Sequence, residues 1–216
     1  MRKLNHTEWL KITSDLWILD TVKSGYKIEF NPVPDFSGFL PEIHCSKEKA
    51  DILYLEIEKL LQKGAIEKVD PVESQFISNI FLVPKKDGSL RPVINLKHLN
   101  FFVEYQHFKQ ENISLALNLI QEDDYLTSID LCDAYFSISI HDDYNKYLRF
   151  LWKGIIYEFQ DLCFGLASAP RIFTKLLKPV YSFFRKLGIR CIYYIDDSLN
   201  MHQNFKNVLK IHGKEA

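Results

Sequence analysis

Three aspartates lie at the ends of two apolar segments that have the composition of β-strands. Asp196 and Asp197 follow the segment IRCIYYI (189–195), and Asp130 lies near the end of LTSIDL (126–131). Magnesium prefers carboxylate oxygens and is usually held by one or two of them together with substrate phosphates. If the two segments are neighbouring strands of one sheet, the three carboxylates converge, as two-metal phosphoryl transfer requires.

Adjacent aspartates are also ordinary turn residues, and the chain has two other Asp-Asp pairs, at positions 123–124 and 142–143. Those pairs lie in polar stretches, whereas Asp196-Asp197 interrupts an expected hairpin of apolar residues. If that hairpin is buried, an uncompensated charge in it is costly, and a cation is expected beside it. Spacing alone leaves the metal site and the structural acidic turn equally open.

The overall charge is nearly balanced, but its distribution is uneven. The chain has 216 residues, 47% of them hydrophobic, and a formal net charge of -1, so it can hold one large domain or two small ones. Near-neutrality argues weakly against a nucleic-acid partner, because such domains are commonly basic. Residues 171–190, however, contain six basic residues and no acidic one. This segment could line a nucleic-acid channel or form an ordinary solvated helix face.

Nothing in the sequence indicates secretion or membrane insertion. A polar or charged residue breaks every apolar run near the N-terminus within a few positions, so we expect no signal peptide. No stretch approaches the length of a membrane span. The four cysteines are far apart and form no C-x-x-C pair, so neither a zinc site nor a disulfide framework is expected. We expect an intracellular protein, in the cytoplasm or the nucleus, without a membrane partner.

Periodicity, capping residues and turn signals predict the elements that must position these side chains. In order, we expect a helix that starts after Ser46 and ends at Lys63-Gly64, strands over 78–84 and 89–96 joined at Asp87-Gly88, a helix over 112–121, a strand over 126–131, a helix capped by Ser168 that ends before Gly188, and hairpin strands over 189–195 and 198–201. Asp130 and Asp196-Asp197 are then both at strand ends.

Five segments in this order resemble reverse transcriptases of retroelements, and the resemblance covers residues 60–201. The segments are KGAIEKV (63–69), SNIFLVPKKDGSLRPVINLKHLN (78–100), SIDLCDAYFSI (128–138), LCFGLASAPRIF (162–173) and YIDD (194–197). The second segment, with YLRFLWKG (147–154) and KITSDLWILD (11–20), is most similar to DIRS-type elements, the tyrosine-recombinase retrotransposons. Gypsy-like LTR elements are the next most similar.

The resemblance implies an α+β fold, namely a polymerase palm with an antiparallel sheet backed by helices, together with a fingers subdomain. The thumb of the family is expected to be absent. The expected divisions are an N-terminal extension over 1–45, fingers over 46–105 and 138–163, and palm over 106–137 and 164–216.

The resemblance assigns Asp130, Asp196 and Asp197 as catalytic residues and as ligands of two Mg²⁺ ions, with Mn²⁺ as the alternative metal. The main-chain carbonyl of Leu131 is expected to be a further metal ligand. These are the carboxylates that the spacing of the strands singles out, so the two lines of reasoning agree.

The resemblance also assigns phosphate-binding groups for the incoming deoxynucleoside triphosphate. Lys85 and Arg91, with Lys86 beside them, lie on the expected hairpin and would clamp the phosphates. Ordinary surface charge on a solvated hairpin is the alternative. Asp133 and Ala134 would offer backbone N–H groups to the triphosphate.

The sugar and base of the nucleotide would meet three further residues. Tyr135 would leave no room for a 2′-hydroxyl, although a core tyrosine is an equal alternative from its position alone. Phe164 would line the sugar, and Gly165 would let the backbone pass close to the nucleotide. Cys163 replaces the proline and Asn95 the aspartate that are usual in the family.

The implied activity is that of an RNA-directed DNA polymerase, in which a primer 3′-hydroxyl attacks a deoxynucleoside triphosphate and releases pyrophosphate. The implied partners are deoxynucleotides, a primer–template of RNA or DNA, and other polyprotein domains (thumb, RNase H and recombinase) outside this chain. Because the chain ends soon after Asp197, the alternative is a truncated, catalytically silent remnant that at most binds nucleic acid. An RNA-templated RNA polymerase is disfavoured by YIDD in place of the usual GDD and by Tyr135 as a gate.

Overall fold

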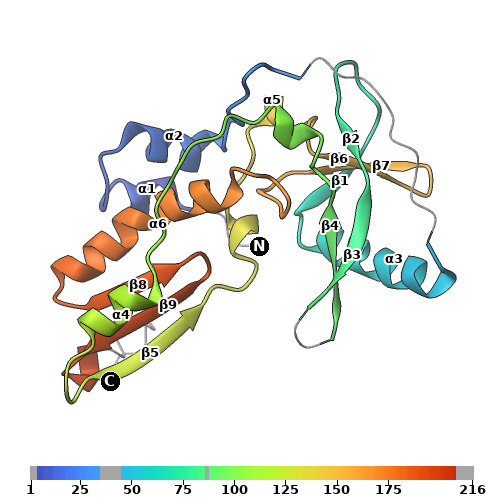
Figure 1. Cartoon of the computed structure of the whole chain (residues 1–216). Helices are drawn as coiled ribbons and strands as arrows, with labels where there is room; N and C mark the ends of the chain where they lie inside the picture. The colour runs from blue at the N-terminus through green and yellow to red at the C-terminus, as the bar shows by residue number, and fades with distance from the viewer. Residues whose placement is uncertain (1–3, 35–44, 86–87, 208–216) are drawn as a thin grey trace.

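The computed structural model of the chain describes residues 4–34, 45–85 and 88–207. The expected hairpin tip at Lys86 and Asp87 lies outside the described residues, as do positions 35–44 of the expected N-terminal extension and 208–216 of the expected palm. The elements are α1 (His6–Trp9), α2 (Leu16–Ser24), α3 (Lys47–Gln62), β1 (Ile66–Val69), β2 (Ile77–Ser78), β3 (Ile80–Pro84), β4 (Leu90–Ile94), η1 (Leu99–Phe101), α4 (Ile113–Leu119), β5 (Tyr125–Asp130), η2 (Ala134–Ser137), α5 (Asp142–Asn145), β6 (Arg149–Trp152), β7 (Ile155–Phe159), α6 (Ala169–Lys186), β8 (Arg190–Tyr194) and β9 (Asp197–His202) (Figure 1).

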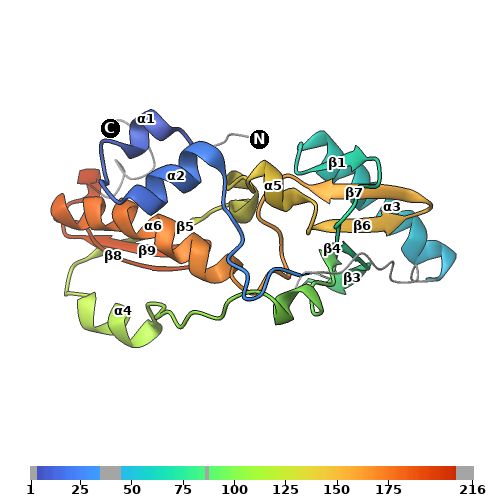
Figure 2. The same cartoon turned by 90° about the horizontal axis from the view of Figure 1, so that it is seen from above.

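Three antiparallel strands form the sheet that carries the aspartates, in the order β5-β9-β8. Because side chains alternate between the two faces of a strand, Cys191 and Tyr193 share one face, and both are buried against α6. The ring of Tyr193 stacks on that of Tyr181 with the centroids 4.3 Å apart. Figure 2 shows α6 lying between this sheet and the helices α1 and α2. The predicted palm, an antiparallel sheet backed by helices, is therefore confirmed.

A second unit contains the remaining strands and α3 (right side of Figure 1). It has a four-stranded sheet in the order β1-β7-β6-β2 and the separate hairpin β3-β4. Helix α3 begins as predicted, because Ser46 Oγ accepts a hydrogen bond from the backbone N–H of Lys49 at 3.4 Å. It ends at Lys63, after which Gly64 adopts φ +67°. The elements of this unit lie within the ranges 46–105 and 138–163 that were expected to be the fingers.

The N-terminal arm, defined here as residues 25–31, forms backbone hydrogen bonds with two segments that are far away in the sequence. The N–H of Tyr26 donates to the carbonyl of Ser139 at 2.8 Å, and the N–H of His141 donates back to Tyr26 at 3.0 Å. Five residues further along, Asn31 donates to the carbonyl of Phe102 at 2.7 Å. Such long-range backbone bonds have no local sequence signature, and they make the arm an integral part of the fold.

Side chains of the arm also reach the start of α6. Glu29 forms an ion pair with Arg171 in the first turns of that helix. Tyr26, which is 1% exposed, donates its hydroxyl to Ser168 Oγ at 3.1 Å. Ser168 is the N-cap residue of α6, as predicted, but its backbone is already helical (φ -78°, ψ -15°) and its side chain makes no capping bond. The Ser168 hydroxyl instead ties α6 to the N-terminal arm.

Candidate active site

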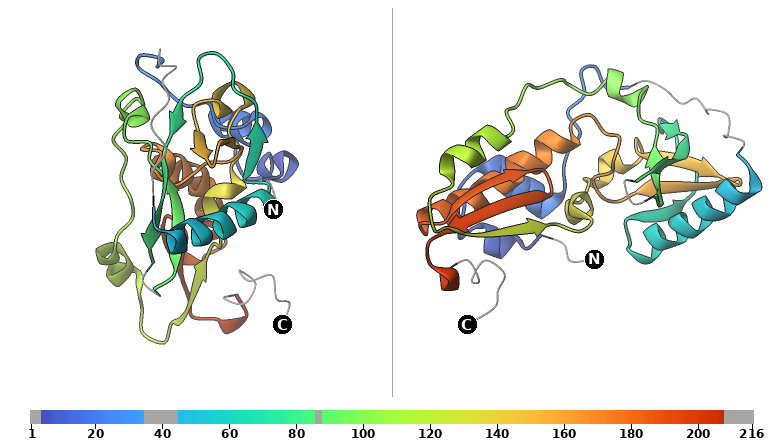
Figure 3. Two further views of the ribbon diagram at one scale, coloured as in Figure 1. Left: turned by 90° about the vertical axis from the view of Figure 1, so that its right-hand side faces the viewer. Right: turned by 60° about the horizontal axis from the view of Figure 1, so that its bottom comes forward.

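The strand register brings the predicted metal-binding aspartates together. Asp130, the last residue of β5, lies directly opposite Asp197, the first residue of β9. Strand β8 pairs Tyr194 with the same Asp197, so Ile195 and Asp196 form the two-residue turn of the β8-β9 hairpin. Figure 3 shows the three strands side by side, with β5 directed toward the unit that contains α3. The three carboxylates thus come from one end of one sheet.

The turn that carries Asp196 is held in an uncommon conformation. Ile195 has φ +54°, a region that β-branched residues rarely occupy and that costs on the order of 1–3 kcal/mol. The Ile195 side chain packs against the hydrophobic core, and the N–H of Leu131 donates to the carbonyl of Asp196 at 3.0 Å. These contacts fix the turn next to the end of β5.

The carboxylates are more exposed than the apolar strands suggested. Asp130 and Asp197 are exposed, and Asp196 is half-buried. The argument that a buried uncompensated charge requires a cation is therefore wrong here. Residues opposite each other share a face, so Asp130 and Asp197 lie on the face of the sheet that α6 does not cover. That face is open at the aspartates.

A cleft of ≈ 430 Å³ connects these aspartates with the second unit. It brings together nine of the eleven residues that the sequence assigned to the site, namely Lys85, Arg91, Asp130, Leu131, Asp133, Ala134, Tyr135, Phe164 and Asp196. Asp197 and Gly165 do not line it. The cations come from the β3-β4 hairpin and the carboxylates from the palm sheet, so the cleft presents opposite charges on its two walls.

Tyr135 and Phe164 form the apolar part of the cleft. Their ring centroids are 5.0 Å apart, and Tyr135 also contacts Phe173 edge-on at 5.4 Å. Burial, and secondarily the negative charge of Asp196, raise the pKa of the Tyr135 phenol to about 12. The Arg91 guanidinium lies 5.1 Å from the centroid of the Phe164 ring, within the range of a cation–π contact. Tyr135 is 6% exposed, so it belongs to the core and to the cleft wall at once.

Gly165 was expected to let the backbone pass close to the nucleotide, but in the structure it packs closely against the backbone of β4. Its φ is +105°, and a Cβ at this position would lie 2.6 Å from the carbonyl oxygen of Ile94 in β4. The carbonyl of Gly165 accepts a hydrogen bond from Asn100 Nδ2 at 2.8 Å. A glycine is therefore required here to join the β3-β4 hairpin to the segment before α6, whatever its role toward a nucleotide.

The oxygen ligands at this site suit a magnesium ion whose coordination is completed by substrate phosphates. Among the described residues, no three His, Cys, Asp or Glu side chains form a cluster that could hold a metal on their own. Asp130, Asp196 and the backbone of Leu131 nevertheless line one cleft. Magnesium is usually bound through one or two carboxylates plus substrate phosphates, so this set is suitable.

Three charged cleft residues were not among those that the sequence assigned to the site: Glu56, Lys59 and Lys63, at the C-terminal end of α3. Lys63 had been interpreted only as the first residue of the segment KGAIEKV (63–69) and as the residue before the helix-terminating Gly64. It forms an ion pair with Asp133 on the opposite wall, with Nζ 2.6 Å from Oδ2. Its lysine-glycine context signals a helix end, and nothing local signals a partner 70 positions away.

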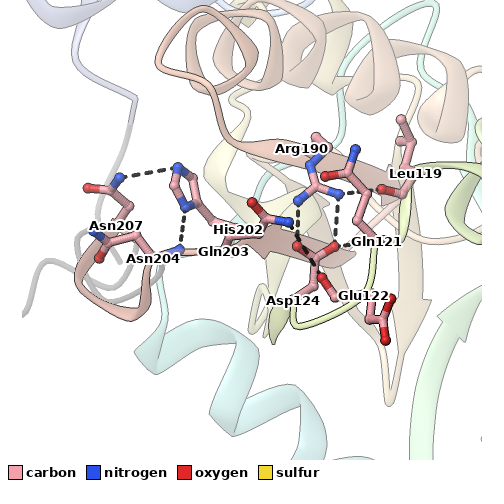
Figure 4. A network of polar contacts seen from close by, with 9 residues as sticks. All are labelled: Leu119, Gln121, Glu122, Asp124, Arg190, His202, Gln203, Asn204 and Asn207. Carbon is pink, nitrogen blue, oxygen red and sulfur yellow. Dashed lines mark hydrogen bonds and ion pairs between the residues drawn. The ribbon is translucent and has the colours of Figure 1, made fainter.

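The basic segment 171–190 is mainly structural. Arg190 at the start of β8 makes a two-pronged ion pair with Asp124, whose side chain is 2% exposed, and donates to the carbonyl of Leu119 at 2.6 Å (Figure 4). Arg185 similarly pairs with Glu111 at 2.6 Å. Because α6 covers the sheet face opposite the aspartates, the expectation that this segment lines the channel is not supported.

The pair at positions 123–124 has a structural role of its own. Arg190 holds the pKa of the Asp124 carboxyl below its ordinary value, mainly through its hydrogen bonds. Asp124 also accepts a bond from the N–H of Gln121 at 2.7 Å. The turn before β5, which reads as polar in sequence, is therefore fixed to β8 (Figure 4).

No helix among the described residues is both long enough and apolar enough to cross a membrane.

Comparisons with known proteins agree with this geometry. The profile of the family described as "Reverse transcriptase (RNA-dependent DNA polymerase)" matches residues 83–216. The chain is 28% identical over 155 residues to the "Retrovirus-related Pol polyprotein from transposon opus" of Drosophila melanogaster, which covers 69% of this chain and 15% of that protein. It is 25% identical over 216 residues to the "Genome polyprotein" of Petunia vein clearing virus (isolate Shepherd), which covers 98% of this chain and 9% of that protein.

A third relative is the "Transposon Tf2-3 polyprotein" of Schizosaccharomyces pombe, 27% identical over 144 residues, which covers 67% of this chain and 10% of that protein. The chain thus spans a small part of the length of these curated relatives. Among solved structures, it is similar to one described as "Structure of the foamy viral protease-reverse transcriptase in complex with dsDNA", with a TM-score of 0.67 and 22% identity. That match covers 88% of this chain and 39% of the other, and it shows a shared fold.

Proposed function

The chain belongs to the reverse transcriptase (RNA-dependent DNA polymerase) family, and from that premise we propose that it catalyses templated addition of deoxynucleotides to a primer 3′-hydroxyl. The observation that carries the proposal is the cleft in which Asp130 and Asp196 face Lys85 and Arg91. A divalent-metal phosphoryl transfer needs this combination of carboxylates and phosphate-binding cations.

Asp130, Asp196 and the Leu131 carbonyl would hold two magnesium ions, or manganese as the alternative, with Asp197 beside Asp130 completing the set. When bound, the ions would supply the charge that activates the primer hydroxyl and neutralises the leaving pyrophosphate. Lys85 and Arg91 bind the triphosphate from the hairpin. Because Arg91 already lies over Phe164, the cation is held near the position that the nucleotide would take.

The turn after Asp130 provides the remaining phosphate contacts. Asp133 adopts φ +53° and begins the short helix η2, so the N–H groups of Asp133 and Ala134 are candidates for oxygens of the triphosphate. Tyr135 follows directly and would pack under the sugar. In this arrangement one turn orients the phosphates, the sugar and the first metal-binding carboxylate together.

The proposal extends to the partners and the setting of the domain. It would act on a primer–template of RNA or DNA, as part of a polyprotein with further domains such as a thumb, RNase H and recombinase. A DIRS-type origin is proposed from segments 11–20, 78–100 and 147–154, and a recombinase gene in the same genomic element would support it over a gypsy-like origin. An intracellular setting suits the four free cysteines.

The nucleotide preference of the chain tests the proposed function. Extension of a primed RNA template is compared with four deoxynucleotides and with four ribonucleotides, at equal concentrations. We expect extension with deoxynucleotides. Preferential use of ribonucleotides would instead indicate an RNA-templated RNA polymerase.

Replacing Tyr135 with valine is expected to weaken discrimination against ribonucleotides by about 5- to 150-fold, the size of a steric penalty of 1–3 kcal/mol. The ratio of kcat/KM for deoxy- and ribonucleotides measures this effect. Tyr135→Phe keeps the ring and should keep the discrimination, because the ring carries the proposed steric effect. If both variants discriminate like the wild type, Tyr135 is a core residue and not the gate.

A further inference from the structure

The ion pair between Lys63 and Asp133 crosses the cleft from the end of α3 to the turn after the first metal-binding aspartate. Lys63 is the C-cap residue of α3, so its backbone position is fixed by the helix end. Asp133 is the N-cap residue of η2, yet its side chain makes no capping bond. Its carboxylate points to Lys63, with 2.6 Å between Oδ2 and Nζ.

Solvent exposure makes this pair exchangeable. The Lys63 side chain is 41% exposed and the Asp133 side chain is 31% exposed. Water and salt screen such pairs, so they contribute little to folding and can change partners at low cost. A triphosphate carries several negative charges and binds cations much more strongly than one exposed carboxylate does.

A second ion pair in the cleft, between Lys59 and Glu56, differs in a way that singles out Lys63. Lys59 pairs with Glu56 on its own helix, with 2.5 Å between Nζ and Oε1, so that pair stays on one wall. Lys63 instead reaches the wall that carries Asp130 and Asp196. It is therefore already extended toward the space in which the phosphates of a nucleotide would lie.

We propose that Lys63 is a phosphate-binding residue that Asp133 holds in place until a nucleoside triphosphate takes it over. This inference rests on the proposed function and adds a third side-chain cation, on α3, to the two on the hairpin. In the free protein the pair joins the fingers to the palm. On binding, the lysine moves from the Asp133 carboxylate to the phosphates. The N–H groups of Asp133 and Ala134 bind the same triphosphate.

The test compares Lys63→Met, Asp133→Asn and the exchanged pair Lys63→Asp with Asp133→Lys. Lys63→Met is expected to raise the KM for deoxynucleotides about tenfold, the value of one charge-assisted hydrogen bond. Asp133→Asn releases the lysine and should lower that KM by a factor of about two to five, the strength of an exposed ion pair. Lys27→Met, which breaks the exposed pair of Lys27 with Asp20 on the N-terminal part of the chain, is the matched control and should leave KM unchanged.

The exchanged pair separates phosphate binding from a purely structural role. If Lys63 binds phosphate, the exchange leaves KM raised, because an aspartate at position 63 repels the triphosphate. If the pair only joins the two units, the two single substitutions change KM in the same direction and the exchange restores it. That second pattern would overturn the inference.

A binding assay without turnover keeps this test independent of the proposed function. Deoxynucleoside triphosphate is expected to raise the melting temperature of the wild type through binding to the folded state, less in Lys63→Met and more in Asp133→Asn. A wild-type chain that is stabilised in this pattern but does not extend a primer would contradict the proposed function alone. Equal stabilisation of all three proteins would overturn the role of Lys63.

Discussion

Replacing Asp196 with asparagine is expected to lower the rate of primer extension by about 10³-fold, because the loss of one metal-binding carboxylate removes on the order of 4 kcal/mol of transition-state stabilisation. Asp196 lies in the two-residue turn of the β8-β9 hairpin and lines the cleft opposite Lys85 and Arg91. Single-turnover extension of a primed template, with metal and nucleotide in excess, measures the effect.

The fold should tolerate this substitution. The bond that fixes the turn is made by the backbone carbonyl of Asp196 with Leu131, so we expect the melting temperature to stay near that of the wild type. Asp142→Asn changes an exposed aspartate in α5 and should retain full activity. Asp197 does not line the cleft. Its replacement with asparagine is therefore expected to lower the rate of primer extension less than Asp196→Asn does. Full extension by Asp196→Asn would show that the turn is only structural.

Replacing Gly25 with alanine is expected to destabilise the fold by about 3 kcal/mol or more, from backbone strain together with overpacking. Gly25 has φ +90°, and a Cβ would lie 2.6 Å from the backbone nitrogen of His141 and 2.7 Å from the carbonyl of Ile140. Those neighbours are backbone atoms that cannot rotate away, so the N-terminal arm would have to separate from the core. Urea denaturation measures the change in the free energy of unfolding.

Gly154 provides a matched control for the arm. It has φ +75°, and nothing lies within 4 Å of the position that its Cβ would take. Gly154→Ala should therefore cost about 1 kcal/mol, from the backbone conformation alone. Equal destabilisation by the two substitutions would mean that the arm is not packed against Ile140 and His141 as described.

The geometry of the candidate site was predictable in part, because it depends on strand ends and register. The apolar segment before Asp196 and the strand ending at Asp130 were both found in sequence, and antiparallel pairing then places Asp130 opposite Asp197. The helix α3 was predictable for a similar reason, since Ser46 and Gly64 mark its two ends locally. Neighbouring residues mark each of these ends, whereas the pairing of β5 with β9 was expected only on the condition that the two segments are neighbours in one sheet.

Features that depend on distant contacts were not predictable. The N-terminal arm has no periodicity because Tyr26 pairs with the segment near Ile140 instead of with a neighbouring strand. Lys63 gives no local sign of its pair with Asp133. The exposure of Asp197 was misjudged because the hairpin that carries Asp196-Asp197 was taken to be buried, whereas α6 covers one face of its sheet only.

Magnesium-dependent extension of a primed RNA template by the wild-type chain, with filter binding of the same template in parallel, is the decisive measurement for the proposed polymerase activity. We expect extension with deoxynucleotides that stops when the metal is chelated. Template binding without any extension, at every metal concentration, would contradict it and indicate a domain that holds nucleic acid without polymerising.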